Sequence, residues 1–167
     1  MPEIIIRHAS ESDLPILTEL YDHYVMTTPI TFDIEPWSIE VREEWFSQFE
    51  TSGRYQCFVA EWQGRICGYA CTGRFHHKQA YATSVETSIY LARDMHGKGT
   101  GSLLYGALFQ ALSDEDVHRA YASITQPNAA SNALHRKFGF ESVGVFHEVG
   151  RKFGKYWDVE FFEKVLR

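Results

Sequence analysis

The order of apolar and polar positions along the chain predicts an alternation of short strands and helices. Ile4 to Ile6 form a β-branched run, and Ser10 can cap a helix whose apolar positions recur at helical spacing. Ser38 is a second candidate N-cap, and the helix that follows it is expected to end near Gly53. The first helix is marked by Leu14, Leu17, Leu20, Tyr21 and Tyr24, and the second by Ile39, Arg42, Trp45, Phe46 and Phe49.

The rest of the chain continues this alternation. Residues 57–62 and 66–72, joined by Gln63 and Gly64, predict a β-hairpin, and the alternation over residues 85–91 predicts a strand half buried on one face. An apolar stripe over residues 103–112 predicts a helix. A strand at about 120–125, a helix opened by Asn128 and closed by Gly139, and two aromatic-rich strands at about 141–149 and 156–165 complete the chain.

This element order, β-α-α-β-β-β-α-β-α-β-β, predicts one α/β unit around a mixed sheet. The 167 residues are 44% hydrophobic and 15% aromatic, which is enough to bury the core of a single domain covering residues 1–167.

Charge and cysteine usage exclude several classes of partner and compartment. The formal net charge of −6, without a cluster of basic residues, argues against nucleic acid or an anionic membrane as the main partner. We see no secretory signal and no apolar run of the roughly 20 residues that cross a bilayer. The three cysteines, Cys57, Cys67 and Cys71, are expected to be buried thiols, with no metal site, in the cytoplasm.

A glycine-rich stretch before the strongest helix is the sharpest chemical feature. It comprises His96, Gly97, Lys98, Gly99, Thr100, Gly101 and Ser102. A helix N-terminus has free amides and partial positive charge, and glycine lets a phosphate approach that backbone closely. A dinucleotide fingerprint would need glycine at Ser102 and a P-loop would need it at Ala92. The alternative is a strand-to-helix turn that is rich in glycine for steric reasons alone.

Two further features indicate a function only when they are considered together with the glycine-rich stretch. Asn128, Ser131 and His135 share one face of the predicted helix, although a lone histidine there is more often on the surface or satisfied in a core. Glu86 is a carboxylate in an otherwise uncharged strand, where it is equally explained as a solvated side chain.

Together these features resemble the GCN5-related N-acetyltransferase (GNAT) superfamily over essentially the whole chain. Gly99 and Gly101 match the two small positions of its pyrophosphate loop, whereas His96 replaces an Arg or Gln. The resemblance implies a mixed, mostly antiparallel central sheet flanked by about four helices, and acetyl-CoA as co-substrate. It also implies cofactor contacts from the glycine-rich stretch, from Asn128 and Ser131, and from Ile89, Tyr90 and Leu91, where the strand should splay from its neighbour.

Within the superfamily, the chain is most similar to the phosphinothricin and methionine sulfoximine acetyltransferases. The shared stretches are residues 31–36, 80–81, 85–90, 128–140 and 154–159. This resemblance implies Glu86 and His135 as the catalytic pair, and Phe32, Lys78, Tyr81 and Ser88 as substrate contacts. Lys78 replaces what is often Arg, which weakens a bidentate grip on an anion.

The hypothesis is direct acetyl transfer to a small amine, with Glu86 accepting a proton through a water and His135 assisting. Acetylation of a protein N-terminus or a lysine, and a non-catalytic acetyl-CoA-binding module, stay open as alternatives. The same resemblance makes a homodimer an expectation, with residues 143–146 and 156–162 of the C-terminal strands as its surface; an internal core explains those residues equally well. The sequence does not identify the natural amine, the principal base or the biological role.

Overall fold

A computed structural model, which describes residues 3–167, contains all the elements in the predicted order. The strands are β1 (Ile4–His8), β2 (Cys57–Trp62), β3 (Arg65–Arg74), β4 (Ser84–Leu91), β5 (Arg119–Thr125), β6 (Glu141–Lys152) and β7 (Lys155–Val165). The helices are α1 (Leu14–Thr27), α2 (Ile39–Phe46), α3 (Thr100–Leu112) and α4 (Ala129–Lys137). Short 3₁₀ turns at Glu11–Asp13, Gln79–Tyr81 and Arg93–Met95 precede α1, β4 and α3.

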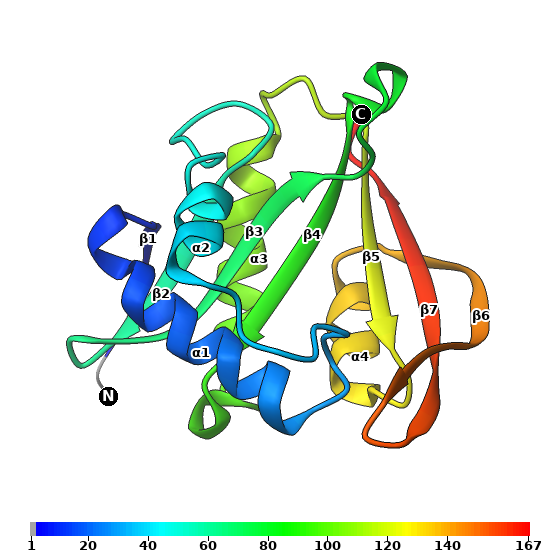
Figure 1. Cartoon of the computed structure of the whole chain (residues 1–167). Coiled ribbons are helices and arrows are strands. Elements are labelled where there is room, and N and C mark those ends of the chain that lie inside the picture. Colours follow the sequence, from blue (N-terminus) through cyan, green and yellow to red (C-terminus); the bar gives the residue numbers. More distant parts are fainter. Residues whose placement is uncertain (1–2) are drawn as a thin grey trace.

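The strands form one mixed sheet in the order β1-β2-β3-β4-β5-β7-β6. Every neighbouring pair is antiparallel except β4 and β5, which are parallel. Helices cover both faces, with α1 and α2 in front and α3 behind in Figure 1. The expected mixed, mostly antiparallel sheet is therefore confirmed.

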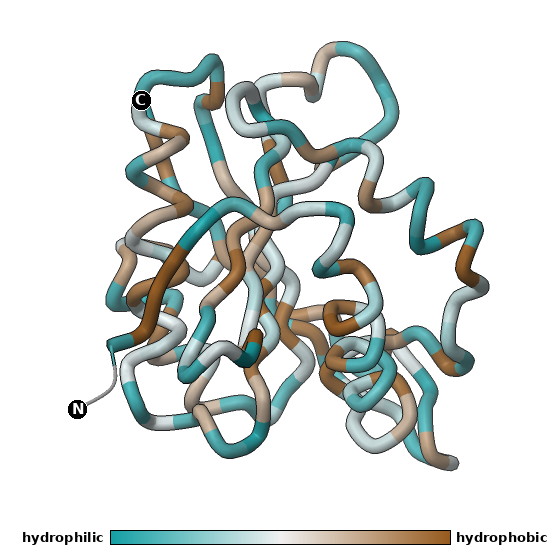
Figure 2. Tube along the Cα trace, turned by 90° about the vertical axis from the view of Figure 1, so that its left-hand side faces the viewer, coloured by the Kyte–Doolittle hydropathy of each residue, from teal (hydrophilic) through white to brown (hydrophobic). Residues whose placement is uncertain are grey.

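Each face of the sheet has its own apolar core. On the α1 side, Leu17 packs with Val59 and Tyr69 from the strands. On the α3 side, Leu104 and Leu108 pack against alternate residues of the strands. In Figure 2 the apolar run of β1 is the brown stretch that follows the N-terminus. Cys57, Cys67 and Cys71 are buried and free, as predicted.

Several local predictions need correction. The helix after Ser38 ends at Phe46, not near Gly53, because Gln48 donates a side-chain hydrogen bond to the Trp45 carbonyl and the chain turns there. Ser10 begins the 3₁₀ turn before α1, not the helix itself. On α3, Leu103 is 47% exposed and Tyr105 is fully buried, so the buried stripe is rotated from the predicted one.

The hairpin turn and the two helix caps predicted from the sequence are present in the structure. Gln63 and Gly64, between β2 and β3, both have positive φ, as a two-residue hairpin loop requires. Ser38 accepts a hydrogen bond from the Val41 amide, and Asn128 caps α4 in the same way through Ser131. No helix within residues 3–167 is long and apolar enough to cross a membrane.

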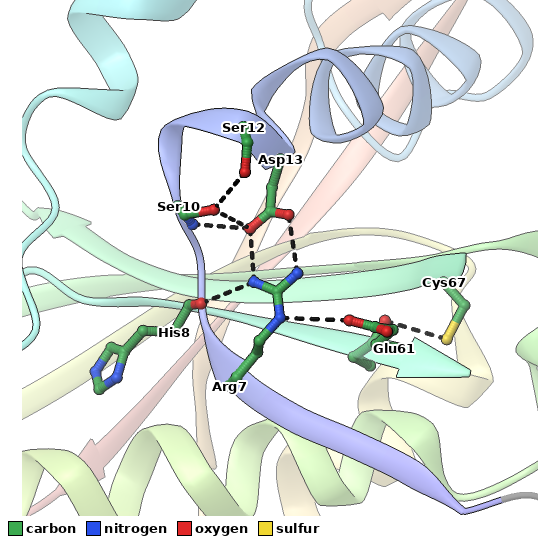
Figure 3. A network of polar contacts seen from close by, with 8 residues as sticks. Arg7, His8, Ser10, Ser12, Asp13, Glu61 and Cys67 are labelled. Carbon is green, nitrogen blue, oxygen red and sulfur yellow. Dashed lines mark hydrogen bonds and ion pairs between the residues drawn. The ribbon is translucent and has the colours of Figure 1, made fainter. Parts of the chain in front are cut away.

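An ion pair ties the start of α1 to the edge of the sheet (Figure 3). Arg7 of β1 donates two hydrogen bonds, at 2.7 and 2.9 Å, to the carboxylate of Asp13, which also accepts from the Ser10 amide. Glu61 of β2 contacts the same guanidinium at 3.4 Å. The Arg7 hydrogen bonds lower the pKa of Asp13, which is itself buried.

We expect Asp13→Asn to lower the free energy of unfolding at pH 7 by about 1–3 kcal/mol, because it removes one partner of a buried, charge-assisted bond. Since the pKa of Asp13 is lower in the folded chain, this contribution is complete above about 3.9, the usual aspartate pKa, and declines as pH falls through the folded value. Urea unfolding at pH 7 and pH 3 measures both effects. Asp94→Asn, in an exposed pair with Arg65, should cost less than about 1 kcal/mol; equal losses in the two variants would contradict this account.

Candidate active site

A gap between β4 and β5 forms the candidate site. The two strands pair only from Ser84 to Glu86 and from Arg119 to Tyr121. Beyond that point β4 stays paired with β3 and β5 with β7, so the strands diverge (Figure 1). A cavity of about 500 Å³ lies in the opening. Its lining includes Thr31, Phe32, Glu86, Thr87, Ser88, Ile89, Tyr90, Tyr105, Asn128, Ser131 and His135.

The splay leaves main-chain groups of β4 facing the gap. The Ala92 amide bonds the Cys67 carbonyl of β3, and in an antiparallel ladder alternate residues face away from the partner strand. Ile89 and Leu91 therefore direct their main-chain groups toward β5. The Leu91 carbonyl accepts a hydrogen bond from the Tyr24 hydroxyl at 2.5 Å. Ile89 is left as the residue whose main chain faces the cavity, whereas Leu91 does not line it.

Glu86 lies at the end of the strand pairing, where the cavity begins. Its side chain is half buried, on the same face of β4 as Ser88 and Tyr90. Burial raises the pKa of Glu86, and the Ser123 hydroxyl partly offsets this rise. A carboxylate with a raised pKa is better suited to accept a proton near neutral pH.

His135 lines the cavity from α4 and is only 2% exposed. Its Nδ1 lies 2.7 Å from the Ser131 carbonyl, which can only accept, so we assign the proton to Nδ1. Its Nε2 then accepts from the Tyr105 hydroxyl at 2.8 Å. Burial lowers the pKa of His135, which keeps the ring neutral. Both ring nitrogens are thus satisfied, as in the core-histidine alternative.

Tyr105 is a cavity residue that the sequence analysis missed. It comes from α3, is fully buried, and lies 3.4 Å from the Thr87 hydroxyl as well as beside His135. Burial raises its pKa. The spacing indicates that Tyr105 shares the buried face of α3 with Leu104, Leu108 and Leu112, but it does not show that this face reaches the cavity.

The glycine-rich stretch forms the N-terminus of α3. Gly97 and Gly99 have φ of 73° and 82°, a region that favours glycine, and Gly99 is the N-cap. The amides of Thr100, Gly101 and Ser102 bond no other described residue. Gly101 is small for a different reason, since a Cβ there would come within 3.2 Å of Leu134 on α4. The arrangement fits an anion, with the free amides pointing out of the helix end.

The side chains of this stretch have several orientations. His96 turns back toward α1, with Nε2 3.1 Å from the Tyr24 hydroxyl. Lys98 is exposed and lies over the Trp62 ring. Ser102 accepts a hydrogen bond from Lys137 of α4.

Phe32 is held over the cavity by a network from three elements. Lys152 of β6 is buried and donates to the carbonyls of Thr31 and Asp33, on either side of Phe32. The Tyr21 hydroxyl donates to the Asp33 carboxylate. The Phe32 ring packs so closely on Gly150 that an added Cβ would lie 2.1 Å from it.

Two residues predicted as substrate contacts lie elsewhere. Lys78 and Tyr81 are exposed in the turn before β4 and do not line the cavity. Tyr81 packs instead beside Phe75 and His76. In a monomer, therefore, the site contains Phe32 and Ser88 but neither of the other two. Within residues 3–167 no cluster of side chains could hold a metal ion.

The chain is similar in sequence and in fold to known acetyltransferases. The chain is 53% identical to a phosphinothricin N-acetyltransferase of Streptomyces coelicolor over 167 residues, covering 98% of this chain and 97% of that protein. It is 33% identical to an L-methionine sulfoximine/L-methionine sulfone acetyltransferase of Pseudomonas paraeruginosa, covering 95% and 92%. The crystal structure of a phosphinothricin acetyltransferase from Sinorhizobium meliloti in complex with acetyl-CoA superposes with a TM-score of 0.90 at 32% identity, covering 97% and 88%.

The family model for the acetyltransferase (GNAT) domain matches residues 6–160, nearly the whole of the sheet and its helices. The chain therefore belongs to the GNAT acetyltransferase family.

Proposed function

We propose that this protein transfers the acetyl group of acetyl-CoA directly to the primary amine of a small, amino-acid-like substrate, such as phosphinothricin, methionine sulfoximine or a related compound. The observation that carries the proposal is the β4–β5 opening, which brings a half-buried carboxylate and a free main-chain edge into one cavity. The names of the relatives support the substrate class.

The cofactor-binding residues follow from the helix end and the strand edge. The main-chain amides of residues 96–102 bind the pyrophosphate of acetyl-CoA, with Lys98 as an additional cation. Asn128 and Ser131 line the opposite side of the opening. The Ile89 main chain, which faces the gap, bonds the pantetheine arm and polarises the thioester carbonyl.

Glu86 acts as the base. An amine attacks a thioester only when it is unprotonated, and at neutral pH most aliphatic amines carry a proton. Glu86 accepts that proton through a water, the amine nitrogen bonds the acetyl carbon, and the carbon–sulfur bond breaks. The nitrogen loses its second proton as it becomes an amide, and the departing thiolate gains one through the Tyr105 hydroxyl, which gives its proton to the sulfur and regains one from the nitrogen. His135 Nε2, 2.8 Å away, positions that hydroxyl.

A free-thiol assay with acetyl-CoA tests the function. The panel contains phosphinothricin, methionine sulfoximine, methionine sulfone, common amino acids, and peptides with a free N-terminus or lysine. Turnover of the small amines and not of the peptides is the expected result, because Phe32 and the β6 residues Phe146 and Val149 line the cavity and narrow the space for a longer chain. Turnover of peptides alone would favour a protein acetyltransferase, and calorimetric binding of coenzyme A without any turnover would favour a binding module.

Two features of the whole chain belong to the same proposal. Its three buried, free cysteines suit a reducing cytoplasm.

The edge strand β6 carries exposed apolar side chains, which are Val143, Val145, Phe146 and Val149. A second copy of the chain covers this strand, so that the protein is a homodimer.

We expect Glu86→Gln and His135→Asn each to lower kcat by roughly 100-fold while leaving acetyl-CoA affinity within about twofold. Because burial raises the pKa of Glu86, wild-type kcat/KM should fall as the pH drops through that raised value, and Glu86→Gln should lack this limb. Steady-state kinetics from pH 5 to 9 measure both. Glu43→Gln, on the exposed face of α2, is the control; full activity in both site variants would rule out the proposed proton path.

We expect Gly150→Ala to raise KM for the amine by roughly tenfold with KM for acetyl-CoA unchanged, because the new methyl group displaces the Phe32 ring. Gly106→Ala, where an added Cβ meets nothing within 4 Å, is the matched control. A parallel rise in both KM values in Gly150→Ala would show that Phe32 is not a wall of the amine site.

We expect light scattering to give the mass of a dimer for the wild type and of a monomer for Val143→Glu, whose side chain is 58% exposed on β6. Val165→Glu, 52% exposed at the end of β7, should remain dimeric. A monomeric wild type at micromolar concentration would refute the dimer.

A further inference from the structure

One wall of the candidate site is made by a loop. Residues 28–38, between α1 and α2, contain no helix or strand, yet Ile30, Thr31 and Phe32 of this loop line the cavity. Loops move more than the helices and strands around them unless specific contacts hold them. A wall that shapes the amine site therefore needs support from a rigid part of the fold.

Lys152 of β6 supplies that support to the main chain of the loop. Its Nζ donates hydrogen bonds to the carbonyl of Thr31 at 2.8 Å and to that of Asp33 at 2.7 Å. The two carbonyls belong to the residues on either side of Phe32. The ammonium group thus fixes the main chain before and after the residue whose ring reaches the cavity.

The two carbonyl bonds are what this lysine provides and an apolar side chain would not. Lys152 is 5% exposed, and within residues 3–167 it forms no ion pair. Burial lowers its pKa, and the Asp33 carboxylate, whose charge opposes this shift, accepts instead from the Tyr21 hydroxyl. A buried ammonium costs stability unless it is hydrogen-bonded, so its place here depends on the loop carbonyls.

The strand that presents Lys152 is itself held firmly. Lys152 pairs with Lys155 across the β6–β7 turn, and its carbonyl accepts from the Trp157 indole at 2.9 Å. Gly150, two residues earlier, lies on the same face of β6 and takes the Phe32 ring. One face of β6 therefore holds both the ring, through Gly150, and the main chain, through Lys152.

We propose that Lys152 is a positioning residue of the amine site, which fixes Phe32 against Gly150 and so sets the affinity for the amine. Lys152 does not line the cavity, so it touches no substrate and acts through the Phe32 ring. This inference rests on the proposed function, because it assumes that the amine binds beside Phe32.

A substitution that keeps the length of the side chain tests the role. We expect Lys152→Met to raise KM for phosphinothricin at least tenfold and KM for acetyl-CoA less than twofold, because the loop that carries Phe32 loses both bonds. Lys155→Met removes an exposed lysine of the same hairpin, which lies over the Trp157 ring, and should change neither value. Equal rises of the two KM values in Lys152→Met would overturn the proposal.

A double-mutant cycle separates positioning of Phe32 from a general loosening of the hairpin. In a Phe32→Ala background, Lys152→Met should change KM for phosphinothricin less than twofold, because the ring that Lys152 positions is gone. A tenfold rise in that background would show that Lys152 acts by another route, and would overturn the proposal.

Hydrogen exchange measures the contact without any turnover. In Lys152→Met the peptide over residues 28–36 should exchange at least tenfold faster than in the wild type, while α3 exchanges at the same rate. Unchanged exchange over residues 28–36 would overturn the proposal. Faster exchange in a protein that acetylates no amine would support the Lys152 contact and contradict the proposed function.

A second variant covers the case in which Lys152→Met does not fold, as judged by its thermal melt. Lys152→Gln is neutral, and its amide nitrogen ends one bond short of the position of Nζ, so it should give the same selective rise in KM and the same faster exchange. Wild-type values in this variant for both measurements would likewise overturn the proposal.

Discussion

The short parallel pairing between β4 and β5 is the constraint on which the site depends. Three residues of each strand hold the sheet together, and each strand then follows its other neighbour. Because twisted strands diverge once their shared hydrogen bonds end, the opening needs no flexible loop. Glu86 lies at the last pair, so the carboxylate and the free main chain of Ile89 share one cavity wall.

Burial shifts the pKa values of two side chains in this cavity in opposite directions. It raises the pKa of Glu86 and lowers that of His135, so a carboxylate that binds a proton more readily lines the same cavity as a neutral imidazole. The hydrogen bond between His135 and Tyr105 joins α4 to α3, and the free amides at the start of α3 lie at the same end of the gap. Rigid elements thus position both the proposed proton carriers and the proposed phosphate site.

The sequence predicted every helix and strand in order because the signals are local. Alternation, caps such as Ser38 and Asn128, and the turn at Gln63 and Gly64 act over a few residues. It also placed Glu86, Ile89, Asn128, Ser131 and His135 near one site. Local patterns could not show that Tyr105 enters the cavity or that Lys78 and Tyr81 lie outside it, because these depend on how distant elements pack.

What the sequence determined by itself is therefore the set of elements, the GNAT resemblance and the residues that flank the β4–β5 gap. Tertiary structure alone decided three matters: the satisfied hydrogen bonds of His135, the close fit of Phe32 on Gly150, and the hydrogen bonds of Lys152 to the loop that carries Phe32. The physical reason is separation along the chain. Phe32 and Gly150 are far apart in sequence, and only the folded sheet brings their atoms into contact.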